Sequence, residues 1–344
     1  MHEQLQMALD AITSRITEDN ELIACKCFAL MHGYHARWAQ DIYKVIDIES
    51  VKTSQIRNPD TGAASRTFQM AGKIDVLATR ATQTVLIDHK TTSDSIDNPD
   101  SPYWRQLMVE SQASAYAFLL RSNGVIVDDI LWDVMKKPSI SPKAVAKAMQ
   151  KQVMGTGEYF GSEISEDAIL AMEQTGRENL EMYQVRLIDD CINVRPEWYF
   201  QRQSIMRLDS EILEYGRELW QLSQEIRETA NKKRYIKNSK ACMMYGSSCA
   251  YLGICSGHDT EDSEKWTRKE HVHNELPDLE GETRSFLTNS RITTYMTCRR
   301  KHHYKYELGL ERTDEEEKEV LRFGSLWHEA QEAWWSYFLP TEES

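Results

Sequence analysis

Two short segments place charged side chains at spacings that bring them together on a β-sheet. "LIDHKTTSD" ends an apolar run with Asp88 and Lys90, and "QMAGKIDVLAT" holds Asp75 within a second apolar run. Because side chains alternate along a strand, Asp88 and Lys90 share one face. If the two strands form a hairpin that turns at Ala81 and Thr82, Asp75 stands directly opposite Asp88.

Two opposed carboxylates repel each other unless a cation lies between them. Hard divalent ions such as Mg²⁺ and Mn²⁺ take carboxylate and carbonyl oxygens as ligands. Lys90, one pleat beyond Asp88, would lie beside such an ion and stabilise negative charge on a phosphate or orient an attacking water. The pattern predicts a metal-dependent hydrolytic site. A surface hairpin with a simple lysine–aspartate pair is the alternative.

The surrounding sequence predicts an α/β fold with a mixed sheet, because strand patterns alternate with a helical one. The predicted elements of this core, residues 40–140, are strands over 42–58, 65–80, 84–91 and 125–137 and a helix over 103–124. The elements outside it are helices over 3–18, 20–39, 290–308 and 319–338, a mainly helical region over 142–233 with a short strand near 197–207, a turn-rich cysteine loop over 238–257 and a polar linker over 258–286.

Composition sets limits on location and partners. The 344 residues carry a net charge of −13, and no apolar run reaches the roughly 20 residues of a membrane span. The first residues lack a basic flank and an apolar block, so we expect a cytoplasmic protein without a membrane partner. Net charge does not point to nucleic acid, but clefts act through local charge. Two basic runs are candidate nucleic-acid contacts, with a solvated helix face as the alternative: Lys232, Lys233, Arg234, Arg299, Arg300 and Lys301.

Three of the seven cysteines are clustered in "CMMYGSSCAYLGIC", at Cys242, Cys249 and Cys255. In a reducing compartment, clustered cysteines suggest a metal rather than disulfides, and thiolates suit an iron–sulfur cluster or zinc. Cys25 and Cys27 lie on an apolar helix pattern and are expected in the core.

The order "GKID" then "LIDHK" resembles the core of the PD-(D/E)XK nucleases, specifically the RecB-like exonucleases, which include CRISPR-associated and phage-encoded members. That branch carries a Q-x-x-x-Y motif on the next helix, which reads "QASAY" here. Gln112 and Tyr116 are four residues apart and therefore share one helix face. The resemblance implies a restriction-endonuclease-like sheet flanked by helices, with a helical subdomain stapled by an iron–sulfur cluster.

The resemblance also implies an activity, namely exonucleolytic hydrolysis of phosphodiester bonds, on single-stranded DNA, in recombination, repair or phage DNA processing. Mg²⁺ or Mn²⁺ would be the metal, Lys90 would assist the water, and Gln112 and Tyr116 would position the strand. The implied metal ligands are Asp75, Asp88, His328 and the backbone carbonyl of His89. Recombination or CRISPR-type proteins and an oligomer are the further partners considered. A catalytically silent DNA-binding or assembly module and a structural zinc protein are the alternatives.

Residues 287–344 resemble the beginning of these nucleases, although they come last here. By that match, Cys298 is the fourth ligand of a 4Fe–4S cluster, and His328 sits in a G-x-x-x-H helix whose histidine joins the metal. The chain then reads as circularly permuted, with 287–344 leading into 1–257 and 258–286 as the linker. A second, truncated copy of the domain is the alternative. His302 and His303 are expected to contact the DNA backbone or solvent.

Overall fold

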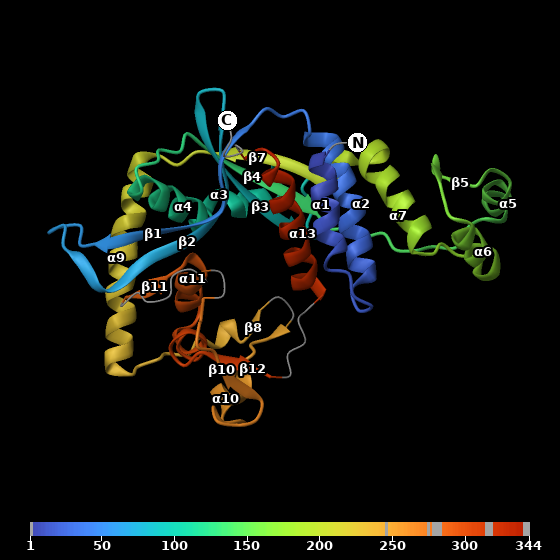
Figure 1. Ribbon diagram of the computed structural model, residues 1–344. Coiled ribbons are helices and arrows are strands. Elements are labelled where there is room, and N and C mark those ends of the chain that lie inside the picture. The colour runs from blue at the N-terminus through green and yellow to red at the C-terminus, as the bar shows by residue number, and fades with distance from the viewer. Residues whose placement is uncertain (1–2, 245–246, 274–275, 277–283, 314–318, 340–344) are drawn as a thin grey trace.

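A six-stranded mixed sheet with helices on both faces forms the centre of the molecule (Figure 1). The structure is a computed structural model and describes residues 3–244, 247–273, 276, 284–313 and 319–339. The strand order is β1-β2-β3-β4-β7, and β11 pairs with β2. The prediction of a mixed α/β sheet flanked by helices is therefore confirmed. The strands are β1 (Lys44–Arg57), β2 (Ala64–Arg80), β3 (Gln83–Thr92), β4 (Asp129–Lys136), β7 (Phe200–Ile205) and β11 (Ser285–Leu287).

The first three strands pair in chain order as antiparallel neighbours, and the chain then crosses over one face of the sheet before β4. β1, β2 and β3 form an antiparallel meander, and the turn between β2 and β3 is closed by Ala81 with φ +55°. β4 is parallel to β3, β7 is antiparallel to β4, and β11 is parallel to β2. A parallel neighbour requires a crossover connection, which here is helical.

The crossover between β3 and β4 differs from the prediction of one helix over 103–124. It consists of α3 (Pro102–Val109) and α4 (Ser111–Ser122), separated by Glu110 in an extended conformation. Arg207 explains the break, because its guanidinium donates to the carbonyl oxygens of Met108 (2.7 Å) and Glu110 (3.3 Å). These bonds satisfy carbonyl groups that a continuous helix would have satisfied itself. The break gives α4 its own direction across the sheet.

One face of the sheet is covered by helices from both halves of the chain. Helices α1 and α13 lie side by side (Figure 1), and Arg15 Nε, just past the end of α1, donates to Glu329 Oε2 of α13 at 2.9 Å. Trp327, Trp334 and Trp335 are at most 1% exposed and belong to the core beneath these helices. The helices of this layer are α1 (Glu3–Thr13), α2 (Glu21–Trp38), α7 (Leu180–Asp189) and α13 (Glu319–Ser336).

The opposite face is covered by α3, α4 and the long helix α9 (Asp209–Lys232). Residues between β4 and α7 form a small projecting lobe with its own apolar cluster (Figure 1). Its elements are α5 (Lys147–Thr156), β5 (Glu158–Tyr159), β6 (Ser162–Glu163) and α6 (Glu166–Thr175). A π-helical turn, Asp190–Val194, and α8 (Pro196–Tyr199) lead from α7 into β7.

The region after α9 is built from short elements around the clustered cysteines. The helix predicted over 290–308 is broken at Cys298, whose backbone is extended (φ −162°, ψ 112°). Within the predicted linker, β10 pairs with β12, while residues 274–275 and 277–283 lie outside the described residues. The elements are a 3₁₀ turn (Ser239–Ala241), β8 (Met243–Met244), β9 (Ser247–Ser248), α10 (Leu252–Ser256), β10 (Trp266–Arg268), α11 (Asn289–Thr297), α12 (Arg299–His302), a π-helical turn (His303–Glu307) and β12 (Leu310–Arg312).

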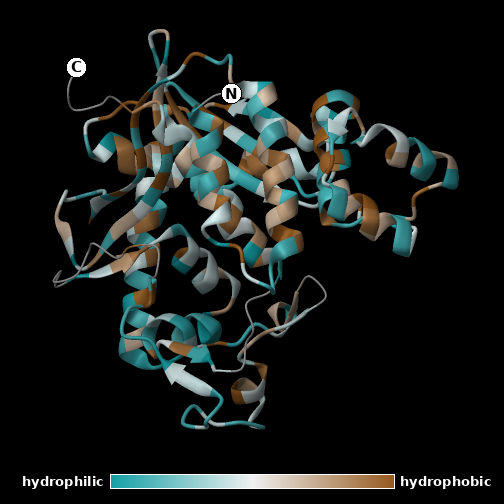
Figure 2. Cartoon of the chain, turned by 45° about the vertical axis from the view of Figure 1, so that its right-hand side comes forward, coloured by the Kyte–Doolittle hydropathy of each residue, from teal (hydrophilic) through white to brown (hydrophobic). Residues whose placement is uncertain are grey.

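Hydrophobic and hydrophilic residues are interspersed along the helices (Figure 2). Among the residues that the structure describes, no helix combines the length and the apolar character needed to span a bilayer.

Gly33 is required by the packing of α2. A Cβ atom there would lie 2.6 Å from Cys191 Cβ and 2.8 Å from Phe200 Cε2. In an open helix, glycine to alanine stabilises by about 0.5–1 kcal/mol, but overpacking a core costs about 1–3 kcal/mol. We expect Gly33→Ala to lower the free energy of unfolding, measured with urea. Gly155→Ala in α5, where a Cβ meets nothing within 4 Å, is the matched control and should raise it. Equal effects would contradict this packing.

Candidate active site

Asp75 stands where β2 leaves β3. The two strands pair from Arg80↔Gln83 to Val76↔Ile87, which is the register that the sequence predicts, and the pairing stops there. One step further, the backbone N–H of His89 donates to Asp75 Oδ2 at 2.8 Å. A side-chain carboxylate thus takes the place of a ladder carbonyl, and β2 no longer pairs with β3 beyond this point, while its pairing with β1 continues.

β2 also changes the face that it presents at this point. Before Asp75, Gly72 faces α4, since a Cβ there would lie 2.9 Å from Leu119 Cδ1, and Ile74 belongs to the same side. After Asp75, Val76 packs with the core of α2 and α13. Strand alternation predicts that Ile74 and Val76 share a face, and this prediction is wrong, because regular alternation ends where the strands separate. Side chains from both faces meet at Asp75.

The α4 face brings together four of the predicted residues. Asp88 is 1% exposed and accepts a hydrogen bond from Gln112 Nε2 at 3.2 Å. Gln112 Nε2 also donates to Tyr116 Oη at 2.8 Å, so the Q-x-x-x-Y pair points at the carboxylate as one unit. The Lys90 ammonium pairs with Asp88 and lies 5.1 Å from the centre of the Trp132 ring. Lys90 and Gln112 therefore contact the same carboxylate, that of Asp88.

Burial and like charge act together on the carboxylates. Burial raises the pKa of Asp75 to about 7, and the neighbouring Asp88 carboxylate contributes to the rise. The charges of His89 and Lys90 and the amide of His89 oppose it. The same environment, first through burial and then through Asp88 and Asp75, raises the pKa of Tyr116 well above 10. The phenol is therefore a neutral hydrogen-bonding group at physiological pH.

The α13 face contributes His328, from a helix far along the chain. Its ring lies 6.3 Å, centre to centre, from the buried ring of His89. Gln331 on the same helix lies within hydrogen-bonding distance of His89 Nδ1, at 3.0 Å. Burial lowers the pKa of His328 to about 3, with further contributions from the charges of His89, Lys90 and Lys73. His328 is therefore neutral at pH 7, the form in which an imidazole nitrogen binds a metal.

Asp133, on the neighbouring strand β4, holds the His89 side chain in place. The sequence did not reveal this role. Asp133 is 2% exposed; Oδ2 lies 3.2 Å from His89 Nδ1 and accepts a hydrogen bond from Tyr34. Arg202 Nε lies 3.1 Å from its other oxygen. Burial alone would raise the pKa of Asp133, but Arg202 and His89 hold it well below its usual range. The sequence offered only an aspartate in an apolar strand.

Glu49 is a third acidic residue near the separated strands, and it too was missed. On β1 the pairs Ile48↔Val76 and Ser50↔Ile74 place Glu49 across from Asp75. Glu49 has φ +50° and its carboxylate pairs with the ammonium of Lys73. A register shift between Val45 and Asp47 sets this alignment, and such shifts leave no clear trace in the sequence.

These residues suit a divalent metal by their chemistry. Asp75 and Asp88 offer hard oxygen ligands whose mutual repulsion a cation would relieve, and the neutral His328 offers a nitrogen. In the part of the chain that the structure describes, no three His, Cys, Asp or Glu side chains are gathered closely enough to hold a metal as they stand. The donor set fits, whereas final coordination requires side-chain movement.

The four predicted cluster cysteines line one small pocket although Cys298 is remote in sequence. Cys298 Sγ accepts a hydrogen bond from the Asn238 amide at 3.4 Å, and the Cys249 amide donates to the Cys242 carbonyl at 2.8 Å. Three cations share the pocket and would offset the charge of thiolates. The pocket is lined by Cys242, Cys249, Cys255 and Cys298 together with Lys237, Arg300 and Lys301, among other residues.

The two basic runs also come together, at the end of α9. Lys232, Arg234 and Arg299 line one groove of about 410 Å³. Lys232 pairs with Glu228, and Arg299 lies 3.2 Å from Glu225. Half of the predicted basic contacts thus share a surface that carboxylates partly neutralise. Lys233 ends α9 with φ +50°, and Arg300 and Lys301 lie at the cysteine pocket.

His302 does not face DNA or solvent, contrary to the prediction. It is 0% exposed, and Arg291 Nε donates to its Nε2 at 3.2 Å. His303 lies beside it, half-buried, and stacks on Tyr235 with ring centres 3.7 Å apart. His302 ends α12 and His303 begins the π-helical turn that follows, and the His302 ring also packs on Tyr295, with ring centres 5.2 Å apart.

A central mixed sheet flanked by helices is consistent with a PD-(D/E)XK nuclease. The chain belongs to the PD-(D/E)XK nuclease superfamily, whose sequence pattern matches residues 3–256 and 287–344. Membership implies a metal-dependent nuclease with DNA as the substrate. No curated protein and no solved structure shows significant similarity to the chain.

Asp75 should make the metal-free protein less stable as pH rises. Its native pKa of about 7 exceeds the usual 3.8, so the native state keeps a proton that the unfolded chain loses, and stability falls from about pH 4 to pH 7. We expect Asp75→Asn, in EDTA, to raise the thermal midpoint at pH 8 by about 2–8 °C and to change it little at pH 4. The exposed Asp19→Asn is the control. A midpoint gain equal at both pH values would contradict the repulsion.

Proposed function

We propose that the protein is a Mg²⁺- or Mn²⁺-dependent DNA exonuclease of the RecB-like type, acting on single strands in the cytoplasm during recombination, repair or phage DNA processing. One observation carries the proposal: Lys90 and Gln112 both bind the Asp88 carboxylate where Asp75 separates two strands. A structural hairpin has no need for two carboxylates, a lysine and an amide at the same buried point.

Each residue has a distinct task in this proposal. Asp75 and Asp88 would hold the divalent ion, which would supply Lewis-acid stabilisation of the phosphate charge. Lys90 places a fixed positive charge beside the scissile phosphate and orients the attacking water. Gln112 and Tyr116 hold Asp88 in place and position the strand through the neutral phenol.

His328 and the His89 carbonyl complete the proposed ligand set. His328 is held neutral by burial and lies against His89. Asp133 and Gln331 both contact His89 Nδ1 and hold the ring, and so restrain the carbonyl of the same residue. The ligands therefore stand on a rigid support, which preorganised sites require.

We further propose a 4Fe–4S cluster at the four-cysteine pocket, with zinc as the competing occupant. The extended backbone at Cys298 turns this residue toward the pocket between α11 and α12. Four thiolates joined in this way would staple α11 to the loop that follows α9. The basic residues of the 232–234 and 299–301 runs would then flank the path of a single strand.

We also propose that the chain is a circular permutation of the usual order, with 287–344 as the original beginning. The superfamily pattern matches two blocks, 3–256 and 287–344. The segment between them, 257–286, consists of the predicted linker 258–286 and the one residue before it. Packing of α13 against α1 supports the proposal, because helices consecutive in the original order would be neighbours.

Nuclease activity on end-labelled single-stranded DNA with Mn²⁺ is the direct test. We expect Lys90→Ala to lower the rate at least about 100-fold, because it removes the charge that stabilises the transition state. Lys44→Ala, an exposed lysine at the far end of β1, should keep the parent rate. If folded parent protein does not cut, the protein is a silent DNA-binding or assembly module; cutting by Lys90→Ala at the parent rate would refute the assigned site.

The cysteine pocket predicts a coloured protein. Anaerobically purified protein should be brown and absorb at about 400 nm, because thiolate-bound iron–sulfur clusters absorb in this region. Cys298→Ser should lose most of this absorbance, whereas Cys25→Ala, in α2, should keep it. Metal analysis decides the alternative: a colourless preparation with one zinc per chain would replace the cluster with a structural zinc site.

A further inference from the structure

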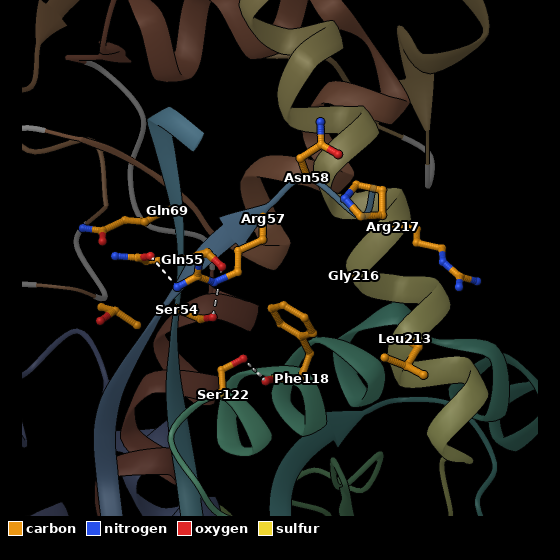
Figure 3. A pocket seen from close by; sticks show the side chains of 12 residues that line it. Ser54, Gln55, Arg57, Asn58, Gln69, Phe118, Ser122, Leu213, Gly216 and Arg217 are labelled. Atoms are coloured by element: carbon orange, nitrogen blue, oxygen red, sulfur yellow. Dashed lines mark hydrogen bonds between the residues drawn. The ribbon is translucent and has the colours of Figure 1, made fainter. Parts of the chain in front are cut away.

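A groove of about 670 Å³ lies beyond the carboxylates, between the outer part of β1 and helices α4 and α9 (Figure 3). We call it the β1–α9 groove. Arg57 lines the groove from the strand and Phe118 lines it from α4, and the Arg57 guanidinium is turned toward Gln55 (Figure 3). Its other lining residues include Ser122 and, from α9, Gly216 and Arg217. None of the catalytic residues proposed above lines it.

The lining chemistry selects an anion that carries a flat ring. The described residues around the groove include two arginines and no aspartate or glutamate, in a chain with a net charge of −13. Arg57 donates to the Gly62 carbonyl and to Gln55 Oε1, each at 3.0 Å, which leaves further guanidinium donors. Phe118 is half-buried, so part of its ring is open to a partner.

Gly216 gives Phe118 its place in the groove. A Cβ at Gly216 would lie 3.0 Å from Phe118 Cε2, closer than a side chain normally packs. Tyr215 packs against the Phe118 ring in a tilted arrangement, with ring centres 5.9 Å apart. The ring is thus held in a fixed position, as an aromatic stacking platform requires.

Helix α4 connects the groove to the catalytic residues. Gln112, in its first turn, contacts Asp88, and Asn123, just past its end, donates to the Thr53 carbonyl of β1 at 3.0 Å. Strand β1 also connects the groove to the carboxylates. Thr53 lines the groove and follows Glu49, which lies across from Asp75, by four residues, or about 13 Å of strand. The groove and the carboxylates therefore lie along one path on the α4 side of the sheet.

We propose that the β1–α9 groove is a strand-holding subsite, in which a nucleotide several positions from the scissile phosphate stacks on Phe118 while Arg57 and Arg217 bind its phosphate. This inference rests on the proposed nuclease function and adds to it a subsite remote from the reacting bond. A polynucleotide long enough to reach from Asp88 to Phe118 gains this contact. A very short one does not.

Binding without cleavage tests the subsite. Fluorescein-labelled dT15 and dT4 are titrated with the parent protein in EDTA, and anisotropy gives the dissociation constants. We expect Phe118→Leu and Arg217→Glu each to weaken dT15 binding about tenfold, and dT4 binding less than twofold. Arg217→Glu should also reduce the salt dependence of dT15 binding, while Phe118→Leu leaves it unchanged. Arg227→Glu, an exposed arginine further along α9, is the matched control.

The outcomes separate this inference from the nuclease itself. If the parent cuts with Mn²⁺ but both variants bind dT15 as the parent does, the subsite is refuted and the nuclease stands. If the variants lose dT15 binding as expected but the parent never cuts, the subsite is supported and the proposed nuclease activity is refuted. A parent that does not bind dT15 refutes the subsite outright. Thermal midpoints within a few degrees of the parent confirm that each variant is folded.

Discussion

Asp75 and Asp88 bring two carboxylates into electrostatic contact where β2 leaves β3, and burial with this like charge raises the pKa of Asp75 to about 7. Neighbouring elements compensate: the His89 amide and Gln112 donate hydrogen bonds, and Lys90 supplies a charge. The separation of the strands admits side chains from both faces of the sheet. A continuous sheet would have kept the Gln112 helix and the His328 helix on opposite sides of an unbroken layer.

A buried ionic network gives this site its rigidity. Asp133 joins Tyr34 of α2, Arg202 of β7 and His89 of β3, and Gln331 of α13 reaches the same imidazole. Removing one member of such a network leaves an uncompensated charge, which costs several kcal/mol, about 3–5. Fold stability and the orientation of the segment that carries the catalytic residues therefore depend on the same contacts.

The sequence predicted what local periodicity controls and missed what tertiary contacts control. The β2–β3 register followed from alternation and a tight turn. The Q-x-x-x-Y pair came from the family resemblance, and helical spacing predicted that Gln112 and Tyr116 share one face. The break at Glu110 was missed because a remote arginine, Arg207, stabilises it. The change of face at Asp75 and the alignment of Glu49 depend on strand pairing, which no window of sequence contains. Cys298 was predicted as a remote ligand through resemblance, while its helix-breaking conformation was not predicted.

The packing of α13 on His89 has a consequence for how the protein is made. His328 follows Lys90 by 238 residues in the sequence. At translation rates of about 5–20 residues per second, a nascent chain spends about 10–50 s with the β2–β3 hairpin complete and the α13 helix still unmade. During that interval Asp75 and Asp88 have neither their histidine neighbour nor the apolar layer that α13 provides. The order of synthesis therefore delays assembly of the site until most of the chain has emerged from the ribosome.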